Sequence, residues 1–291
     1  MSPVDLVKLL PLMELTAGRS DILVGLIDGP VAINHSDLAR ENIREVPATA
    51  RGACTRAASA ACLHGTFVAG ILCAKRGSAA PAICPNCTLL VRPVFAETAP
   101  GELEFPSATA EELAAAILEC IEAGARVLNL SLALMQSSSQ ARLTLTHALS
   151  HAARRGVIIV AAAGNQGAIS STVITSHPWV IPVAACDLYG KPLNETNLSR
   201  SIGRYGFRAP GEQVTSLGAE GRPLTSRGTS AATPFVTGAI ALVWSQFPTA
   251  TGAQLRFAFL HARAQGRSSV APPLLDAWAA YQNLLAAHSR G

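Results

Sequence analysis

The sequence predicts a three-layer α/β fold, in which helices cover both faces of a mostly parallel central sheet. Apolar residues make up 49% of the 291 residues, enough for one substantial core. Short apolar runs alternate with helical patterns along the chain, and this alternation is typical of parallel sheets. Since no internal repeat or low-complexity linker divides the chain, we expect one domain over residues 1–291.

The first predicted strand is the apolar run at residues 22–27, which ends at a turn formed by Asp28-Gly29-Pro30. A loop is expected over residues 47–61. The small and apolar residues 65–74 then predict a close-packed helix, with His64 at its amino end.

The middle of the chain continues the alternation. Residues 87–95 predict a strand, followed by a loop over residues 97–106. Thr109 and Glu112 have the spacing of a capping box, so a helix is expected to begin there and to end at Gly124.

The remaining elements are predicted from the same two signals: glycines mark the ends of helices, and apolar runs mark strands. Gly156 ends one predicted helix, and Gly164-Asn165 follows the strand after it. The strands expected here are residues 126–132, 157–163, 180–185 and 214–217, and the helices are residues 140–155, 230–244, 252–263 and 274–287.

Charge and targeting signals exclude several classes of function. The net charge of +4 comes from 23 basic and 19 acidic residues, without a run of five like charges, which does not favour nucleic-acid binding. The apolar stretch at residues 6–15 is interrupted by Lys8, Pro11 and Glu14, so it does not resemble a signal peptide. No uncharged apolar run approaches the roughly 18 residues of a membrane span. We therefore expect a cytoplasmic protein without a membrane or nucleic-acid partner.

Three motifs carry the residue types of serine acyl transfer. Asp28 follows the first strand, His64 precedes Gly65-Thr66, and Ser230 lies in Gly228-Thr229-Ser230. A serine hydroxyl needs an adjacent base, an imidazole suits that role near neutral pH, and a carboxylate can orient the imidazole. Each motif alone also fits a structural role: a turn, a helix start and an N-cap. Together, in the order Asp, His, Ser, they predict a catalytic triad.

Asn165 is a fourth candidate, because acyl transfer places negative charge on the former carbonyl oxygen. Residues 161–165 bring its side-chain amide to the end of a predicted strand. That amide and the backbone N–H of Ser230 would stabilise the oxyanion.

These motifs resemble those of subtilisin-family serine endopeptidases, over nearly the whole chain. The resemblance implies a subtilisin-like fold, with Asp28, His64 and Ser230 as the triad and Asn165 as the oxyanion donor. It also implies a strand that pairs with an extended peptide substrate. The implied substrate-binding residues are Ser131, Leu132, Ala133, Leu134, Ala163 and Gly164.

The chain departs from the family pattern at several positions near these motifs. Gly29-Pro30 replaces the usual Ser/Thr-Gly after the acid, and Phe67 and Phe235 replace histidines. The glycine expected at the floor of the specificity pocket is missing, and Thr172 or Val173 is nearest to its place. We expect a shallow pocket that favours small or narrow side chains.

The cysteines allow more than one arrangement. Cys54, Cys62, Cys84 and Cys87 flank the histidine motif and could form two disulfides, a zinc site with four thiolates, or remain buried thiols. Residues 77–87 contain no carboxylate, so the calcium loop of secreted relatives is absent. The sequence predicts no cofactor and no catalytic metal.

Among subtilisin-like proteins, the chain most resembles the proteases of cyanobactin-type peptide maturation. Three segments carry this resemblance: residues 84–88, 180–187 and 234–238. It implies cleavage of a leader or follower from a ribosomally made precursor peptide. Only 36 positions separate Asp28 from His64, which leaves little room for the helical insertion of related macrocyclases, so hydrolysis is favoured. Peptide ligation or macrocyclisation, and peptide binding without turnover, are the alternatives.

Overall fold

The computed structural model describes residues 1–46, 53–97, 107–134, 138–262 and 269–289. Its centre is a seven-stranded sheet in the order β2-β3-β1-β5-β7-β8-β9, and every neighbouring pair is parallel. This confirms the predicted α/β fold class. The strands are β1 (Leu23–Asp28), β2 (Ile43–Glu45), β3 (Thr88–Pro93), β5 (Val127–Leu130), β7 (Ile158–Ala162), β8 (Ile181–Cys186) and β9 (Phe207–Pro210).

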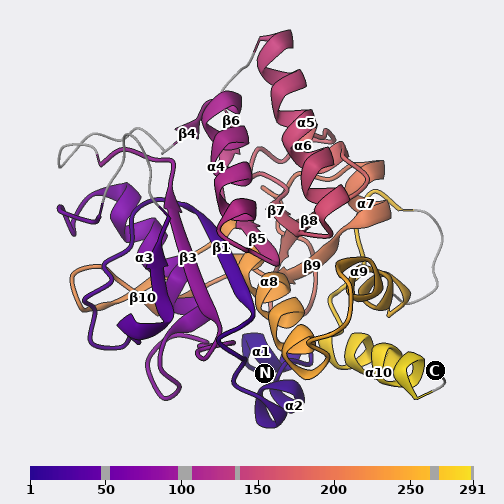
Figure 1. Cartoon of the computed structure of the whole chain (residues 1–291), viewed down its shortest axis with the longest axis horizontal. Coiled ribbons are helices and arrows are strands. Elements are labelled where there is room, and N and C mark those ends of the chain that lie inside the picture. The colour runs from indigo at the N-terminus through magenta and orange to yellow at the C-terminus, as the bar shows by residue number, and fades with distance from the viewer. Residues whose placement is uncertain (47–52, 98–106, 135–137, 263–268, 290–291) are drawn as a thin grey trace.

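Helices cover both faces of this sheet (Figure 1). On one face α3 (Ala60–Cys73) packs against α8 (Thr229–Gln246), and on the other α4 (Ala110–Glu122) packs against α5 (Ser139–Arg155). Strand side chains alternate between the two layers: Val24 and Leu26 join the core beneath α3 and α8, whereas Ile27 joins the core beneath α4 and α5. Both faces are buried, which explains why the strands are continuous apolar runs.

Smaller elements surround these three layers. Two short sheets pair β4 with β6 in parallel and β10 with β11 in antiparallel. The bounds of the smaller elements are β4 (Ser107–Ala108), β6 (Ala133–Leu134), β10 (Val214–Leu217), β11 (Pro223–Ser226), the 3-10 turn η1 (Arg40–Asn42), α1 (Pro3–Leu6), α2 (Leu10–Leu15), α6 (Val173–Ser176), α7 (Arg200–Tyr205), α9 (Gly252–His261) and α10 (Ala277–His288).

Local signals in the sequence explain several helix ends. Thr109 and Glu112 form the predicted capping box of α4, and Gly156 ends α5 with a φ of 69°. Two predicted starts were wrong. α3 begins at Ala60, inside the loop expected over residues 47–61, because the Ser59 side chain caps it. α10 begins at Ala277 rather than 274, because Asp276 caps it.

The loop expected over residues 97–106 lies outside the described residues except for Glu97. The strand β9 was not predicted, because it is a short edge strand that ends in proline. Phe67 and Phe235 are buried in the core beneath α3 and α8. Apolar rings therefore fill space inside the molecule at these two positions.

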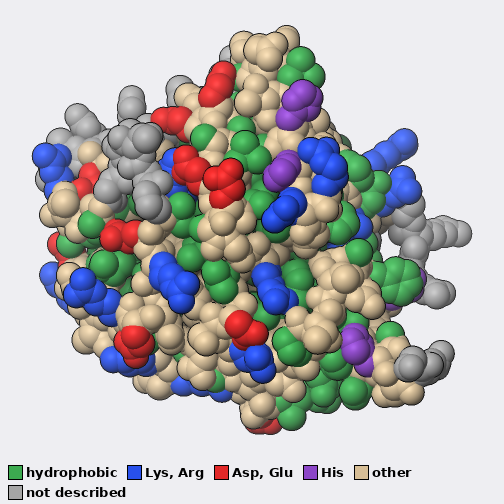
Figure 2. Space-filling view, viewed as in Figure 1, with side chains coloured by type: hydrophobic (Ala, Val, Ile, Leu, Met, Phe, Trp, Pro, Cys, Tyr) green, Lys and Arg blue, Asp and Glu red, His purple; other side chains and the backbone are tan. Residues whose placement is uncertain are grey.

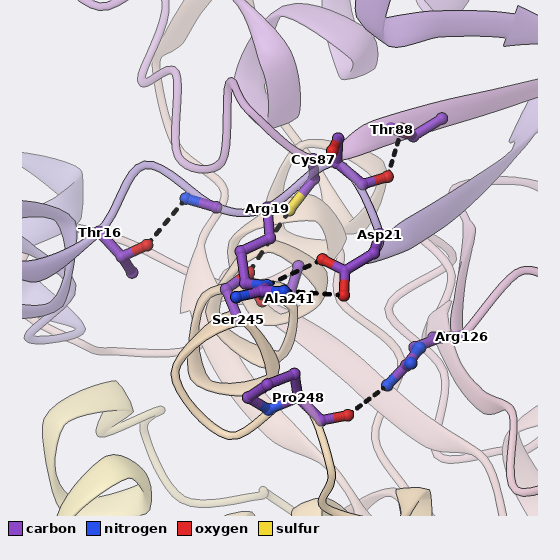
Figure 3. A network of polar contacts seen from close by, with 11 residues as sticks. Thr16, Arg19, Asp21, Cys87, Thr88, Arg126, Ala241, Ser245 and Pro248 are labelled. Carbon is purple, nitrogen blue, oxygen red and sulfur yellow. Dashed lines mark hydrogen bonds and ion pairs between the residues drawn. The ribbon is translucent and has the colours of Figure 1, made fainter.

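The amino ends of the strands are tied to the far end of α8 (Figure 3). The Arg126 guanidinium, just before β5, donates to the Pro248 carbonyl at 2.9 Å. The Cys87 thiol, just before β3, lies 3.8 Å from the Ser245 hydroxyl in a hydrogen bond. α8 therefore begins near Ser230, at the carboxyl ends of the strands, and ends at their amino ends.

Basic and acidic side chains are interspersed over one face of the molecule (Figure 2). Within the described residues, no helix combines the length and apolar character that a membrane span requires.

Candidate active site

The candidate site lies at the carboxyl ends of the central strands. β3 pairs with one side of β1, and β5, the next strand of the central sheet along the chain, pairs with the other side. Such a reversal of strand order opens a crevice beyond the strand ends, where ligands bind in open α/β sheets. Asp28 is the last residue of β1, so it lies at this position.

Two glycines let the end of β1 and helix α3 approach at backbone distance. A Cβ at Gly29 would lie 2.0 Å from the Ala61 carbonyl oxygen, and a Cβ at Gly65 would lie 2.4 Å from the Gly29 carbonyl oxygen. A larger residue at either position would push α3 away. At Gly29, α3 therefore leaves no room for a side chain.

This approach brings Asp28 and His64 together. Asp28 Oδ1 lies 2.6 Å from His64 Nδ1 and also accepts the Gly29 N–H at 2.6 Å. Asp28 is fully buried, and its Oδ2 accepts no hydrogen bond from a described residue. Pro30 has no N–H to offer it. The short contact to a buried carboxylate fixes the orientation of the imidazole ring.

His64 is the fifth residue of α3, and 26% of its side chain is exposed. Burial lowers its pKa, but the charge of Asp28 and the hydrogen bond to Asp28 outweigh burial, and the pKa is raised above the ordinary value. An imidazole held in this way suits a general base near neutral pH.

Ser230 is the second residue of α8 and is half-buried. Gly228 precedes the helix with a φ of 113°, a conformation suited to glycine. Between these two described residues the structure shows no hydrogen bond from Ser230 Oγ to His64. Catalytic hydrogen bonds are often long before substrate binds.

Ser131 contacts the helix of Ser230 rather than facing the crevice. Pro234 has no N–H, so the Ser230 carbonyl lacks its usual helical donor. The Ser131 hydroxyl, only 2% exposed, donates to that carbonyl at 3.0 Å and accepts a hydrogen bond from Asn129 at 2.9 Å. The Ser131 side chain therefore stabilises the first turn of α8, whereas the substrate role predicted for this residue was backbone pairing along the strand.

Asn165 is exposed just beyond β7, and Thr229 sets its orientation. Its Oδ1 accepts the Thr229 N–H at 2.9 Å and the Thr229 hydroxyl at 3.1 Å. Its Nδ2 donates to no described residue. The carboxamide is thus turned with its donor free at the start of α8, close to Ser230.

A cavity of about 160 Å³ lies beside this asparagine. Three predicted substrate-binding residues line it: Leu132, Ala163 and Gly164. Ser131, Ala133 and Leu134 are not among its lining residues, and the backbone of Ala133–Leu134 forms β6, which pairs with β4. The side chains of Ala133 and Leu134 lie outside the described part of the chain.

Of the two residues nearest to the missing glycine, Thr172 lines both this cavity and a neighbouring one between α5 and α6, and Val173 lines the neighbouring one. Sequence reasoning missed Gln166, Ile174 and Asn197, which also line the cavity, and Thr229. Only Gln166 had a signal, since it directly follows Asn165.

The structure resolves the cysteine alternatives. Cys54 and Cys62 form a disulfide, whereas Cys84 and Cys87 are buried free thiols, so these four cysteines do not form a zinc site. A hydrogen bond with Cys73 raises the pKa of Cys84 well above its ordinary value. Glu97 lies beside the disulfide and accepts the Thr55 and Arg56 N–H groups.

Comparison with known proteins gives a consistent picture. The sequence model of the subtilase family matches residues 19–276. The chain is 29% identical over 268 residues to the subtilisin of Bacillus sp. (strain TA39), covering 83% of this chain and 60% of the relative. It is 32% identical over 185 residues to the thermophilic serine proteinase of Bacillus sp. (strain AK1), covering 63% and 43%. The chain thus spans about half of the length of these curated relatives.

Solved structures are similar over almost their full length. The protease domain of PatA superposes with a TM-score of 0.82 at 28% identity, covering 93% of this chain and 97% of that one. The prenylagaramide maturation protease PagA gives 0.81 at 27% identity, covering 95% and 98%. The PatG macrocyclase domain, at 20% identity and a TM-score of 0.81 over 96% of this chain and 95% of that one, shares the fold. These findings confirm the predicted resemblance to subtilisins and cyanobactin-type maturation proteases.

Proposed function

Because the chain belongs to the subtilase family, we propose that it is a serine endopeptidase whose triad is Asp28, His64 and Ser230. The observation that carries the proposal is the 2.6 Å contact between the buried Asp28 carboxylate and His64 at the strand ends. Ser230 lies at the start of the neighbouring helix α8.

In this mechanism the Ser230 hydroxyl attacks the carbonyl carbon of the scissile peptide bond, and His64 Nε2 accepts its proton. The tetrahedral intermediate collapses to an acyl-enzyme as His64 protonates the leaving amine. Water, deprotonated by His64, then releases the acid product and regenerates Ser230. Asp28 stabilises the charged imidazole in both halves of the reaction.

The oxyanion of each tetrahedral intermediate would accept hydrogen bonds from Asn165 Nδ2 and from the Ser230 N–H in the first turn of α8. The fixed orientation of Asn165 supports this role, since Thr229 occupies its carbonyl oxygen and leaves the donor free.

The proposed substrate is an extended peptide segment of a ribosomally made precursor. The similarity to PatA and PagA, whose structures are described as those of maturation proteases, supports this class. Leu132, Ala163 and Gly164 would hold the residue before the scissile bond in the 160 Å³ cavity, while Ala133 and Leu134 of β6 would pair with the peptide backbone. The small cavity favours a small side chain at the cleavage site.

The test uses a fluorophosphonate probe, which reacts with activated serines. The folded wild-type protein should be labelled, Ser230→Ala should not, and Ser226→Ala, four positions upstream in β11, should be labelled like wild type. A folded wild type that stays unlabelled would overturn the proposal.

Mass spectrometry of products from a peptide pool then separates hydrolysis from ligation, because hydrolysis adds one water to the products and transpeptidation does not. Products that carry the added water support the endopeptidase. Cyclised or joined products without it would show that the same site works as a ligase.

A further inference from the structure

The carboxamide of Asn197 has every hydrogen-bonding position of its two polar atoms engaged with one loop. Asn197 is 5% exposed. Its Oδ1 accepts the N–H groups of Gln166 and Ala168 at 3.1 and 3.0 Å. Its Nδ2 donates to the Ala163 carbonyl at 3.2 Å and to Gln166 Oε1 at 2.6 Å. One buried side chain thus holds four groups of residues 163–168.

Backbone contacts extend this attachment. The Asn197 N–H donates to the Gly164 carbonyl at 2.9 Å, and the Gly167 N–H donates to the Glu195 carbonyl at 2.7 Å. Gly164 has a φ of 101°, and a Cβ there would lie 2.4 Å from Asn197 Nδ2. The Asn197 amide therefore packs directly against the backbone of the loop.

The residue between these anchor points is Asn165. Asn197 holds the backbone before it, at Ala163 and Gly164, and after it, at Gln166. Thr229 holds its side chain. Asn165 is exposed, so its position depends on these attachments rather than on burial.

We propose that Asn197 is a positioning residue for catalysis, which fixes the loop so that Asn165 Nδ2 meets the developing oxyanion. This inference rests on the proposed function, and it assigns to Asn197 an effect on the transition state rather than on substrate binding. A donor stabilises a transition state only when its position is set before the reaction. The Gln166 side chain, which accepts a hydrogen bond from Asn197 Nδ2, forms part of the cavity wall.

The kinetic test is a double-mutant cycle with an alanine-ending peptide p-nitroanilide as substrate. Asn197→Ala should lower kcat by about tenfold to a hundredfold, because the donor is displaced, and should change KM by a smaller factor, since Asn197 also lines the cavity. In the Asn165→Ala background the same substitution should lower kcat by less than about threefold, because the donor is already gone.

Thr196→Ala is the matched control. Thr196 is equally buried, one position away, but its hydroxyl accepts the Ala185 N–H of β8 and contacts no atom of the loop by hydrogen bonding. This variant should keep wild-type kcat even if it is less stable. Equal losses of kcat from Asn197→Ala in both backgrounds would overturn the proposal, because the effect would then not act through Asn165.

A measurement independent of activity completes the test. In wild type the Gln166 and Ala168 amides should exchange slowly with deuterium, and in Asn197→Ala they should exchange faster, while Thr196→Ala leaves them unchanged. Unchanged exchange in Asn197→Ala would overturn the positioning role even if labelling at Ser230 succeeds. An unlabelled wild type with slow exchange at these amides would instead contradict the proposed function.

Discussion

At the residue scale, the charge state of His64 depends on two opposed influences. Burial favours the neutral ring, and the fully buried Asp28 carboxylate at 2.6 Å favours the charged ring. The carboxylate prevails, so the pKa is raised. Removing the carboxylate would leave burial as the remaining influence, which reverses the direction of the shift.

The pH dependence of kcat/KM tests this balance. The general base must be neutral, so wild-type activity should rise with pH through a midpoint above about 6.5, the ordinary histidine value. In Asp28→Asn the midpoint should fall below that value, and kcat should drop by about ten-thousandfold, as in other triads.

Asp37→Asn is the control for this pH profile. The Asp37 side chain forms no ion pair with a described histidine, so the midpoint should stay at its wild-type position. A midpoint that does not move in Asp28→Asn would show that the rise of kcat/KM with pH reflects the titration of a group other than His64.

At the element scale, the short helix α6 and its N-cap form part of the wall of the cavity. Its N-cap, Thr172, accepts the Thr175 N–H and also lines the 160 Å³ cavity. A glycine at an N-cap costs only a few tenths of a kcal/mol relative to threonine. The depth of the pocket can therefore be changed with little loss of stability.

Thr172→Gly should shift the preference at the cleavage site toward larger side chains. The ratio of kcat/KM for phenylalanine over alanine before the scissile bond should rise by about tenfold, measured with matched p-nitroanilides. Ser171→Gly removes a side chain from the neighbouring position. Ser171 lines the second cavity that Thr172 borders but not the 160 Å³ cavity, so this variant should leave the ratio unchanged. A wild-type ratio in Thr172→Gly would show that this cavity does not hold the residue before the cut.

At the scale of the whole molecule, the Cys54–Cys62 disulfide closes a short loop directly before His64. The bond restricts the unfolded chain, and a loop of this length implies about 2–3 kcal/mol of added stability. Five thiols remain free and buried: Cys73, Cys84, Cys87, Cys120 and Cys186.

Cys54→Ser should therefore lower the free energy of unfolding by about 2 kcal/mol, measured by urea denaturation under oxidising conditions. In excess dithiol, wild type and variant should unfold at the same urea concentration. Alkylation of unfolded wild type without reductant should modify five cysteines. Modification of all seven, or equal stability under oxidising conditions, would show that the bond does not form.

The sequence predicted the layers of the fold and the order of the catalytic motifs because both depend on local signals. Apolar runs mark the buried strands, and Asp28 follows such a run. Asn197 gave no signal, because its role comes from contacts with residues about thirty positions earlier. The contact that the Ser131 side chain makes was also not predictable from local signals, because it depends on the carbonyl that Pro234 leaves free, far along the chain. The pairing of Cys54 with Cys62 stayed open because spacing alone allowed several arrangements.

The backbone contact between Gly29 and Ala61 also has a consequence for how the enzyme would fail on heating. The distance between Asp28 and His64 is set by backbone atoms of Gly29 in contact with backbone atoms of α3. No flexible side chain lies between these backbones that could change its conformation before the helix moves. Separating them requires α3 to leave the sheet, and with it the core that α3 shares with α8. Thermal inactivation should therefore coincide with global unfolding instead of preceding it.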